Sequence, residues 1–130
     1  MKETAMIRYT DLNEKFITDR FPELAELVSI ETEGFDEFLP HVVFANVFNG
    51  LAVSFLKLDS YKQSDTLKRI FDMYEELASQ GDEDTRDLVQ VTLLEYLWDE
   101  KITYERTKEF MGENTKVLWE QIDDLYAPQV

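Results

Sequence analysis

The sequence predicts an all-α protein, and three of its features support this fold class. Apolar residues recur every three to four positions over long stretches, as one face of an amphipathic helix requires. The segments between these stretches are short and contain glycine, proline or a residue that can cap a helix. Hydrophobic residues make up 44% of the chain, which suits a folded core rather than a disordered acidic tail. At 130 residues, the chain is predicted to form a single domain over residues 1–130.

The N-terminal part is predicted to contain one helix followed by a shorter one. Tyr9, Leu12 and Phe16 follow a helical period. Pro22 suits the first position of the second helix, and Gly34 is expected to end it. An acidic loop without a neighbouring base should surround Gly34, with the carboxylates of Glu31, Glu33, Asp36 and Glu37.

Residues 42–58 are open to two interpretations. As a helix, the segment places four apolar side chains on one face, namely Phe44, Phe48, Leu51 and Phe55. As a β-hairpin, it has the strong turn signal Asn49-Gly50 followed by alternating apolar residues. The helix is favoured because the neighbouring segments are helical, and a bend is expected near Gly50. Polar residues and Gly50 interrupt the apolar run, so a membrane span is not expected.

The C-terminal half predicts four helices joined by short loops. Ser64 or Asp65 should cap the first, which continues to Gln80. The second follows Gly81 and extends to Glu100. A shorter helix over residues 101–110 is expected to have Thr103 as its N-cap, and the last helix should begin at Asn114 or Thr115. Because such short loops join antiparallel neighbours, the predicted architecture is a compact helical bundle or a short stack of antiparallel helix pairs.

The segment Gly81–Glu100 is predicted to be the centre of this arrangement. Asp82 is its candidate N-cap, and Glu83 and Asp84 suit a first turn where the helix dipole favours negative charge. One predicted face consists of apolar residues, namely Val89, Leu93, Tyr96 and Leu97. A second stripe reaches the surface with acidic side chains. Trp98 points away from the apolar face in this pattern and is predicted to be exposed.

The charge of the chain predicts a basic partner. Thirteen basic and 28 acidic side chains give a net charge of −15, and between Ile70 and Glu100 one base, Arg86, faces ten acids. Such a field repels nucleic acid and anionic lipid and attracts basic proteins. Solubility is the competing explanation for the acidic excess. The partner-binding residues predicted from the clustering are Asp82, Glu83, Asp84, Asp87, Glu95, Trp98, Asp99 and Glu100.

The sequence contains no recognisable catalytic, metal-binding or cofactor-binding set, and an enzyme is not expected. There is no cysteine, which excludes thiol catalysis and disulfides and fits a cytoplasmic protein. The single histidine, His41, lies in an apolar run and is predicted to have a core or capping role. The acidic run 82–87 lacks the spacing and central glycine of a calcium loop. No signal peptide is recognised at the N-terminus.

Part of the chain resembles a family of small bacterial helical proteins found beside polymorphic and contact-dependent growth inhibition toxins. The resemblance is carried by Gly81-Asp82-Glu83, Leu88-Val89 and Leu93-Leu94-Glu95-Tyr96-Leu97, with Leu39-Pro40 upstream. It covers about half of the sequence and does not include the first 35 residues. Members of that family act as immunity proteins, so the resemblance implies that this chain binds and neutralises a cognate toxin.

The resemblance and the charge lead to the same functional expectation. A nuclease toxin needs a basic active site to hold phosphates, and an acidic protein is its electrostatic complement. The chain is therefore predicted to be an immunity protein, monomeric when free, that covers a basic active site. The alternatives are an acidic cytoplasmic secretion chaperone, for which a hairpin at 42–58 would be evidence, and an adaptor or scaffold domain without catalytic activity. A carboxylate enzyme, which would bind metal, is the remaining alternative.

Overall fold

The computed structural model describes residues 6–126 and confirms the predicted all-α class, since no strand occurs among these residues. A single pair of residues, Ile7 and Gly81, forms an isolated parallel β-bridge. The α-helices are α1 (Glu14–Arg20), α2 (Ala25–Thr32), α3 (Pro40–Phe44), α4 (Gly50–Leu56), α5 (Asp65–Gln80), α6 (Glu83–Asp87), α7 (Lys101–Thr107) and α8 (Glu113–Tyr126). Shorter helical segments join or extend them: η1 (Tyr9–Asp11), η2 (Pro22–Leu24), η3 (Ala45–Asn49), η4 (Tyr61–Gln63), η5 (Leu88–Leu94) and η6 (Glu95–Trp98).

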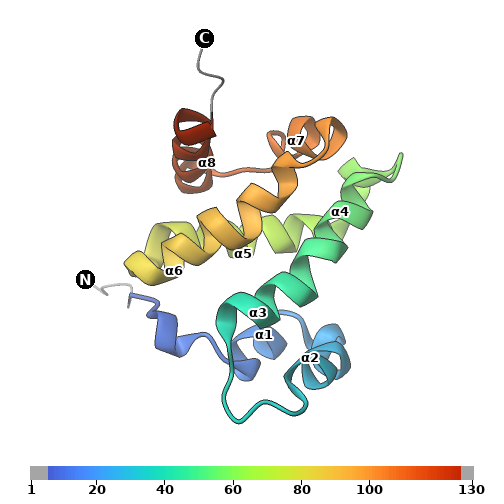
Figure 1. Cartoon of the computed structure of the whole chain (residues 1–130). Coiled ribbons are helices and arrows are strands. Elements are labelled where there is room, and N and C mark those ends of the chain that lie inside the picture. The colour runs from blue at the N-terminus through green and yellow to red at the C-terminus, as the bar shows by residue number, and fades with distance from the viewer. Residues whose placement is uncertain (1–5, 127–130) are drawn as a thin grey trace, which may run out of the picture.

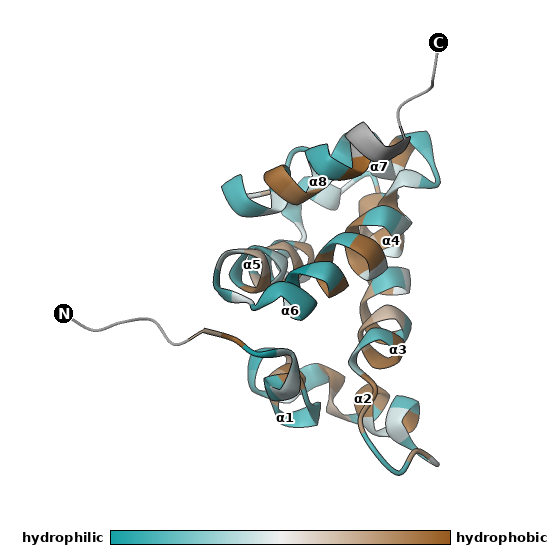
Figure 2. Ribbon diagram, turned by 60° about the vertical axis from the view of Figure 1, so that its left-hand side comes forward, coloured by the Kyte–Doolittle hydropathy of each residue, from teal (hydrophilic) through white to brown (hydrophobic). Residues whose placement is uncertain are grey.

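The middle of the molecule is an antiparallel pair of helices. One member is α5, and the other is the continuous succession of α6, η5 and η6, which we call the central helix (residues 83–98). The helix formed by α3, η3 and α4 contacts both members (Figure 1). The pair α1 and α2 lies at one end of the molecule, and α7 and α8 lie at the other (Figures 1 and 2). Figure 2 also shows that most helices carry both hydrophilic and hydrophobic positions, as amphipathic helices do.

Residues 40–56 are helical, so the favoured helix is confirmed and the hairpin alternative is wrong. Pro40 takes the first helical position, and the Asn49-Gly50 pair continues the helix, with a φ of −64° at Gly50. A π-helical segment, η3, widens the helix immediately before Gly50, where a bend was expected. The reason is packing, because a helix buries Phe44 and Phe48 completely in one core.

The N-terminal helix predicted around Tyr9 and Phe16 is in fact divided. Tyr9 belongs to the 3-10 segment η1, and α1 begins at Glu14. The side chain of Asn13 accepts a hydrogen bond from the Phe16 backbone at 2.9 Å, so Asn13 is the N-cap that starts α1. Pro22 begins the next helical piece as predicted. Gly34 has a φ of +86°, a conformation that favours glycine, and the helix α2 ends two residues before it.

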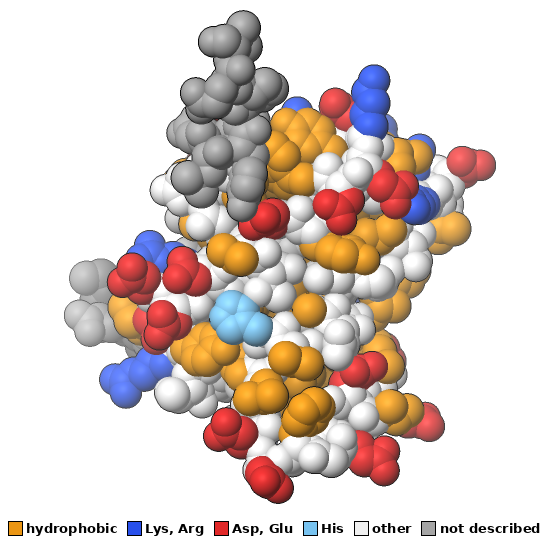
Figure 3. Space-filling model, in the orientation of Figure 1, with side chains coloured by type: hydrophobic (Ala, Val, Ile, Leu, Met, Phe, Trp, Pro, Cys, Tyr) orange, Lys and Arg blue, Asp and Glu red, His pale blue; other side chains and the backbone are white. Residues whose placement is uncertain are grey.

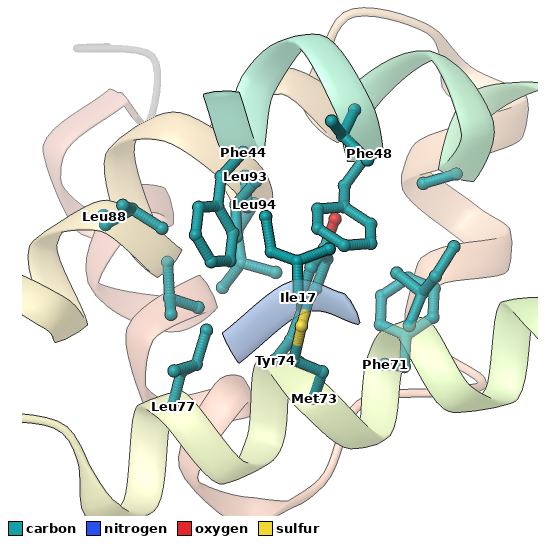
Figure 4. Close-up of a cluster of buried hydrophobic side chains, with 14 of the residues drawn as sticks. Ile17, Phe44, Phe48, Phe71, Met73, Tyr74, Leu77, Leu88, Leu93 and Leu94 are labelled. Atoms are coloured by element: carbon teal, nitrogen blue, oxygen red, sulfur yellow. The ribbon is translucent and has the colours of Figure 1, made fainter. Parts of the chain in front are cut away.

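The core surrounds α5, which buries one face along its whole length. The hydroxyl of Ser64 caps α5 by accepting a hydrogen bond from the Leu67 backbone, as the sequence predicted. Tyr74 is fully buried at the centre of α5, where Figure 4 shows it among side chains of α1, η3 and η5. Burial raises the pKa of the Tyr74 hydroxyl, which has no hydrogen-bond partner among the described residues.

The buried Tyr74 hydroxyl is expected to reduce the stability of the protein. Removing an unpaired polar group from a core recovers its desolvation cost, so Tyr74→Phe should raise the free energy of unfolding by about 1 kcal/mol. Urea denaturation of the two proteins measures this difference. Phe71→Leu, which removes ring contacts in the same core without removing a polar atom, should lower the stability. A Tyr74→Phe protein that is less stable than the original would contradict this reading.

The helix α8 begins at Glu113, and its N-terminus is capped from another helix. The carboxylate of Glu75, on α5, accepts hydrogen bonds from the backbone N–H groups of Asn114 at 3.1 Å and Thr115 at 2.9 Å. The same carboxylate also accepts hydrogen bonds from the side chains of Asn114 and Thr115. Burial is the largest single influence on the pKa of Glu75, and it raises this pKa. The hydrogen bonds from Thr115 and Asn114 together outweigh burial and bring the pKa below its ordinary value of 4.5. The ionised carboxylate of Glu75 therefore links α5 to the N-terminus of α8.

The predicted N-cap of α7, Thr103, is wrong. Helix α7 begins at Lys101, and Glu100 occupies the capping position without a side-chain hydrogen bond. Thr103 is buried and its hydroxyl donates to the backbone carbonyl oxygens of Leu97 at 2.9 Å and Glu100 at 3.0 Å. Thr103 therefore satisfies carbonyl groups at the end of the central helix instead of starting the next one.

Replacing Glu75 with glutamine should destabilise the protein in a pH-dependent way. Glutamine offers one neutral acceptor oxygen in place of the two negatively charged oxygens of the carboxylate. We therefore expect Glu75→Gln to lower the free energy of unfolding by about 1–2 kcal/mol at neutral pH. Because the pKa of Glu75 is lowered by folding, its stabilisation is complete above 4.5 and is lost as the pH falls through the folded-state pKa. The stability difference between the two proteins should therefore shrink in acid. A difference that is constant across this range would contradict the proposed role.

Candidate partner-binding surface

The central helix carries most of the acids predicted to bind a partner, and Asp82 starts it. The side chain of Asp82 accepts a hydrogen bond from the Thr85 backbone at 2.9 Å, which confirms Asp82 as the N-cap. Glu83 and Asp84 follow in the first turn. The inner side of the central helix is buried through Leu88, Val89, Leu93, Leu94 and Leu97. Its opposite side therefore faces solvent with the acids.

The start of the central helix is fixed by the N-terminal segment. The Ile7 backbone donates to the Gln80 carbonyl oxygen and accepts from the Asp82 N–H, both at 2.8 Å. Gly81 is required between them, because a Cβ there would meet the Leu77 carbonyl oxygen and lie 2.6 Å from the Thr85 methyl carbon. The sequence identified Gly81 as a helix stop but contained no signal for its pairing with Ile7.

The structure assigns Asp82 to this junction rather than to free surface. Besides Thr85, the Asp82 carboxylate accepts a hydrogen bond from the Tyr9 N–H at 3.1 Å. Hydrogen bonds from Thr85 lower the pKa of Asp82 below its ordinary value, with further contributions from Tyr9 and the charge of Arg8, while burial acts in the opposite direction. Asp82 thus joins three segments, and its contacts are those of a structural residue.

Two other predicted partner-binding residues are also engaged within the chain. Glu100 forms an ion pair with Lys57 at 2.7 Å. Trp98 was predicted to be exposed, and this is wrong. Its ring packs against Tyr104 and Trp119 at centroid distances of 4.9 and 5.1 Å, and its indole N–H is buried without an acceptor among the described residues. The helical period placed Trp98 outside the core formed by the central helix, but α7 and α8 cover that side.

The remaining predicted acids carry free negative charge. Within residues 6–126, no Lys or Arg lies at ion-pairing distance from the carboxylates of Glu83, Asp84, Asp87, Glu95 and Asp99. They form two groups rather than one strip, because about 18 Å of helix separates Glu83 from Glu95.

Two exposed apolar side chains accompany these acidic groups. Val91 lies between the groups in the sequence, and Tyr96 lies within the second group, next to Glu95. Val91 is 56% exposed, and Tyr96 is 44% exposed. The sequence pattern had placed Tyr96 on the buried face, which is wrong because the π-helical segment η5 shifts the register of the following residues. Tyr96 is therefore the exposed aromatic residue of this surface, in place of Trp98.

His41 joins the N-terminal segment, α3 and the central helix at the surface. Its Nδ1 lies 2.6 Å from the Thr92 hydroxyl oxygen, and its ring lies 5.5 Å from the Tyr9 ring between centroids. Burial raises the pKa of Tyr9, opposed by a backbone hydrogen bond with His41 and assisted by the charge of Asp84. His41 is exposed, so its predicted core role is wrong. No sequence pattern linked His41 to Tyr9 or Thr92, which are distant along the chain.

Figure 3 shows the face of the molecule that contains this surface. His41, the pale blue side chain, lies near its centre beside hydrophobic and uncharged groups, and acidic side chains lie to its left, above it and below it. Basic side chains are fewer and also lie near the edges. We call the exposed side of the central helix, with Glu83, Asp84, Asp87, Val91, Glu95, Tyr96 and Asp99, the acidic surface.

The described residues contain no arrangement suited to a metal. Within residues 6–126, no group of three or more His, Asp or Glu side chains is positioned to hold an ion. The acids of the run 82–87 diverge, since Asp82 points into the junction with Tyr9 while Glu83 and Asp87 line a groove beside α8. No helix in the described part of the chain is long and apolar enough to span a membrane.

The described residues thus form a small all-α protein whose central helix exposes acidic side chains on its outer side. The model of a family described as a domain of unknown function (DUF7674) matches residues 15–127, and the chain belongs to this family. Searches of curated proteins and of solved structures found no match.

The structural role of Asp82 can be separated from partner binding by mutation. Asp82→Ala removes the N-cap and the hydrogen bond to Tyr9, so it should lower the free energy of unfolding by about 1 kcal/mol or more. Glu83→Ala removes a neighbouring exposed carboxylate and should change stability by less than about 0.5 kcal/mol. Urea denaturation of the two variants measures both effects. Equal stability of the two variants would contradict the structural assignment of Asp82.

Proposed function

We propose that this protein is an immunity protein that binds a cognate bacterial toxin through the acidic surface. The observation that carries the proposal is the combination of acidic and exposed apolar side chains along the central helix. Five carboxylates, four on this helix and that of Asp99 directly after it, have no ion-pair partner within residues 6–126, and Val91 and Tyr96 are exposed beside them. Apolar or aromatic anchors within a charged rim are typical of protein interfaces with strong binding. The sequence resemblance to toxin immunity proteins supports the same function.

Electrostatics favours a nuclease as the toxin. An enzyme that cleaves nucleic acid holds phosphates with Lys and Arg, and its active site is therefore positively charged. The acidic surface would cover such a site without presenting a substrate, and a net charge of −15 would accelerate the encounter. In this mechanism the carboxylates mainly raise the association rate, and Tyr96 and Val91 slow dissociation.

The structure bears differently on two of the alternative functions. A hairpin at residues 42–58 would have been evidence for a secretion chaperone of the α/β type. This segment is helical through Leu56, so that evidence is missing. An adaptor or scaffold domain would use the same acidic surface toward a different basic protein. It differs from an immunity protein only in whether binding abolishes toxicity.

The proposed function is tested with the protein encoded next to this one. Co-expression of this chain should restore growth to cells that produce that protein, and the two should form a complex. Persistent toxicity with a folded, abundant chain would refute the immunity function.

Charge reversal tests whether the acidic surface is responsible. Glu95→Lys combined with Asp99→Lys should lower the association rate about tenfold or more at low salt, and the loss should shrink as salt rises. The matched control is Glu26→Lys with Glu33→Lys, which gives the same net charge on exposed residues of the α2 region. If both pairs slow association equally, overall charge and not the acidic surface determines binding.

A further inference from the structure

A pocket between α7 and α8, at the top of Figure 1, differs in character from the acidic surface. Its volume is about 330 Å³, which is at the lower end of the range for small-ligand sites. The residues that line it are Tyr104, Lys108, Met111, Lys116, Trp119 and Glu120. None of them belongs to the acidic surface, so the pocket has no assigned role in the proposed function.

Aromatic rings form one side of this pocket. The rings of Tyr104 and Trp119 lie 5.2 Å apart between centroids, and Trp98 packs against both of them. Trp119 is only 4% exposed, so its ring is held firmly by the core. The half-buried Met111 adds a polarizable apolar group. Such a preformed apolar wall can receive a flat ligand without rearrangement.

Two lysines give the pocket a local positive charge. Among the described residues, Lys108 and Lys116 have no carboxylate within ion-pairing distance, although acids outnumber bases 28 to 13 in the chain. The ammonium of Lys108 lies 4.3 Å from the centroid of the Tyr104 ring. This cation–π contact holds the Lys108 charge beside the aromatic wall.

A neighbouring pocket shows that this charge arrangement is not general. The pocket lined by Lys62, Lys68, Phe71, Asp72, Glu109 and Phe110 also combines lysines with aromatic rings. There the two lysines are balanced by two acids, and Lys62 is paired with Glu109 at 3.3 Å. Among the residues named above as lining the α7–α8 pocket, Glu120 is the one acid, and it forms no ion pair with Lys108 or Lys116.

We propose that the α7–α8 pocket binds a small ligand with a flat apolar body and one carboxylate or phosphate group. The ammonium groups of Lys108 and Lys116 would hold the anionic group, and Tyr104 and Trp119 would contact the apolar body. Glu120 reduces the positive charge of the pocket and should therefore weaken the binding of an anion. The proposal goes beyond toxin binding and does not depend on it.

Tryptophan fluorescence reports on this pocket specifically. The chain has two tryptophans, Trp98 and Trp119, and both belong to the aromatic cluster beside the pocket. Titration with phenylacetate or phenyl phosphate should change the emission saturably, with a dissociation constant on the order of millimolar for so small a probe. Phenylacetamide lacks the charge and acetate lacks the ring, so both should bind at least about fivefold more weakly. The phenylacetate and phenyl phosphate titrations decide which anionic group is preferred.

Single variants test the residues that carry the proposal. Lys108→Gln and Lys116→Gln should each weaken phenylacetate binding about three- to tenfold, and Glu120→Gln should strengthen it about twofold. Lys62→Gln and Lys68→Gln cause the same change of net charge at the neighbouring pocket and should leave binding unchanged. Thermal melting checks that every variant is folded.

The outcomes separate this proposal from the proposed function, since no protein partner is involved in the measurement. Absence of saturable binding by both phenylacetate and phenyl phosphate would overturn the proposal. Equal binding of phenylacetate and phenylacetamide would do so as well, because the lysines would then have no part in recognition. An equal loss of phenylacetate affinity in the Lys62→Gln and Lys116→Gln variants would also overturn the proposal, because binding would then depend on the overall charge of the protein.

Discussion

The junction at Gln80, Gly81 and Asp82 is the contact on which the rest of the structure depends. Backbone hydrogen bonds tie Ile7 to both sides of Gly81, and the Asp82 carboxylate caps the central helix while binding the Tyr9 N–H. Because Gly81 has no side chain, the backbone between α5 and the central helix can lie in close contact with Thr85. The antiparallel pair formed there is the body against which the other helices pack.

The central helix has two different sides because of this pairing. Its inner residues, among them Leu88 and Leu93, are fully buried against the other helices. A charged residue on that side would require a buried partner, and none is available in an apolar core. The acids are consequently confined to the outer side, where they remain unpaired. The same separation that stabilises the core therefore concentrates negative charge on one exposed surface.

Different parts of the surface are suited to different ligands. The acidic surface combines carboxylates with Val91 and Tyr96 and is the surface that we propose for a basic protein. The α7–α8 pocket combines unpaired lysines with aromatic rings and matches a small anion. These regions share the aromatic cluster at the end of the central helix, since Trp98 contacts both Tyr104 and Trp119. A ligand in the pocket would thus contact the same ring cluster that supports the end of the acidic surface.

The sequence by itself determined the helical class, the cap Asp82 and the helix stop at Gly81, and it narrowed the cap of α5 to Ser64 or Asp65. These features depend on local periodicity and on hydrogen bonds between neighbours in the chain, so a short window of residues contains the cause. It also favoured a helix for residues 42–58 over the hairpin suggested by Asn49-Gly50, and the structure has a helix over residues 40–56. Burial of Phe44 and Phe48 in the common core is the physical reason that the helix prevails.

Only the tertiary structure decided which predicted site residues are free. Glu100 has its partner in Lys57, the residue directly after α4. Trp98 is covered by α7 and α8, and the Asp82 carboxylate is hydrogen-bonded to Tyr9, 73 positions away. A helical period reports which side of a helix a residue occupies, but it does not report what packs against that side. The π-helical segments also shift the register and expose Tyr96. For these reasons the acids were predictable as a group, whereas the binding surface required the folded chain.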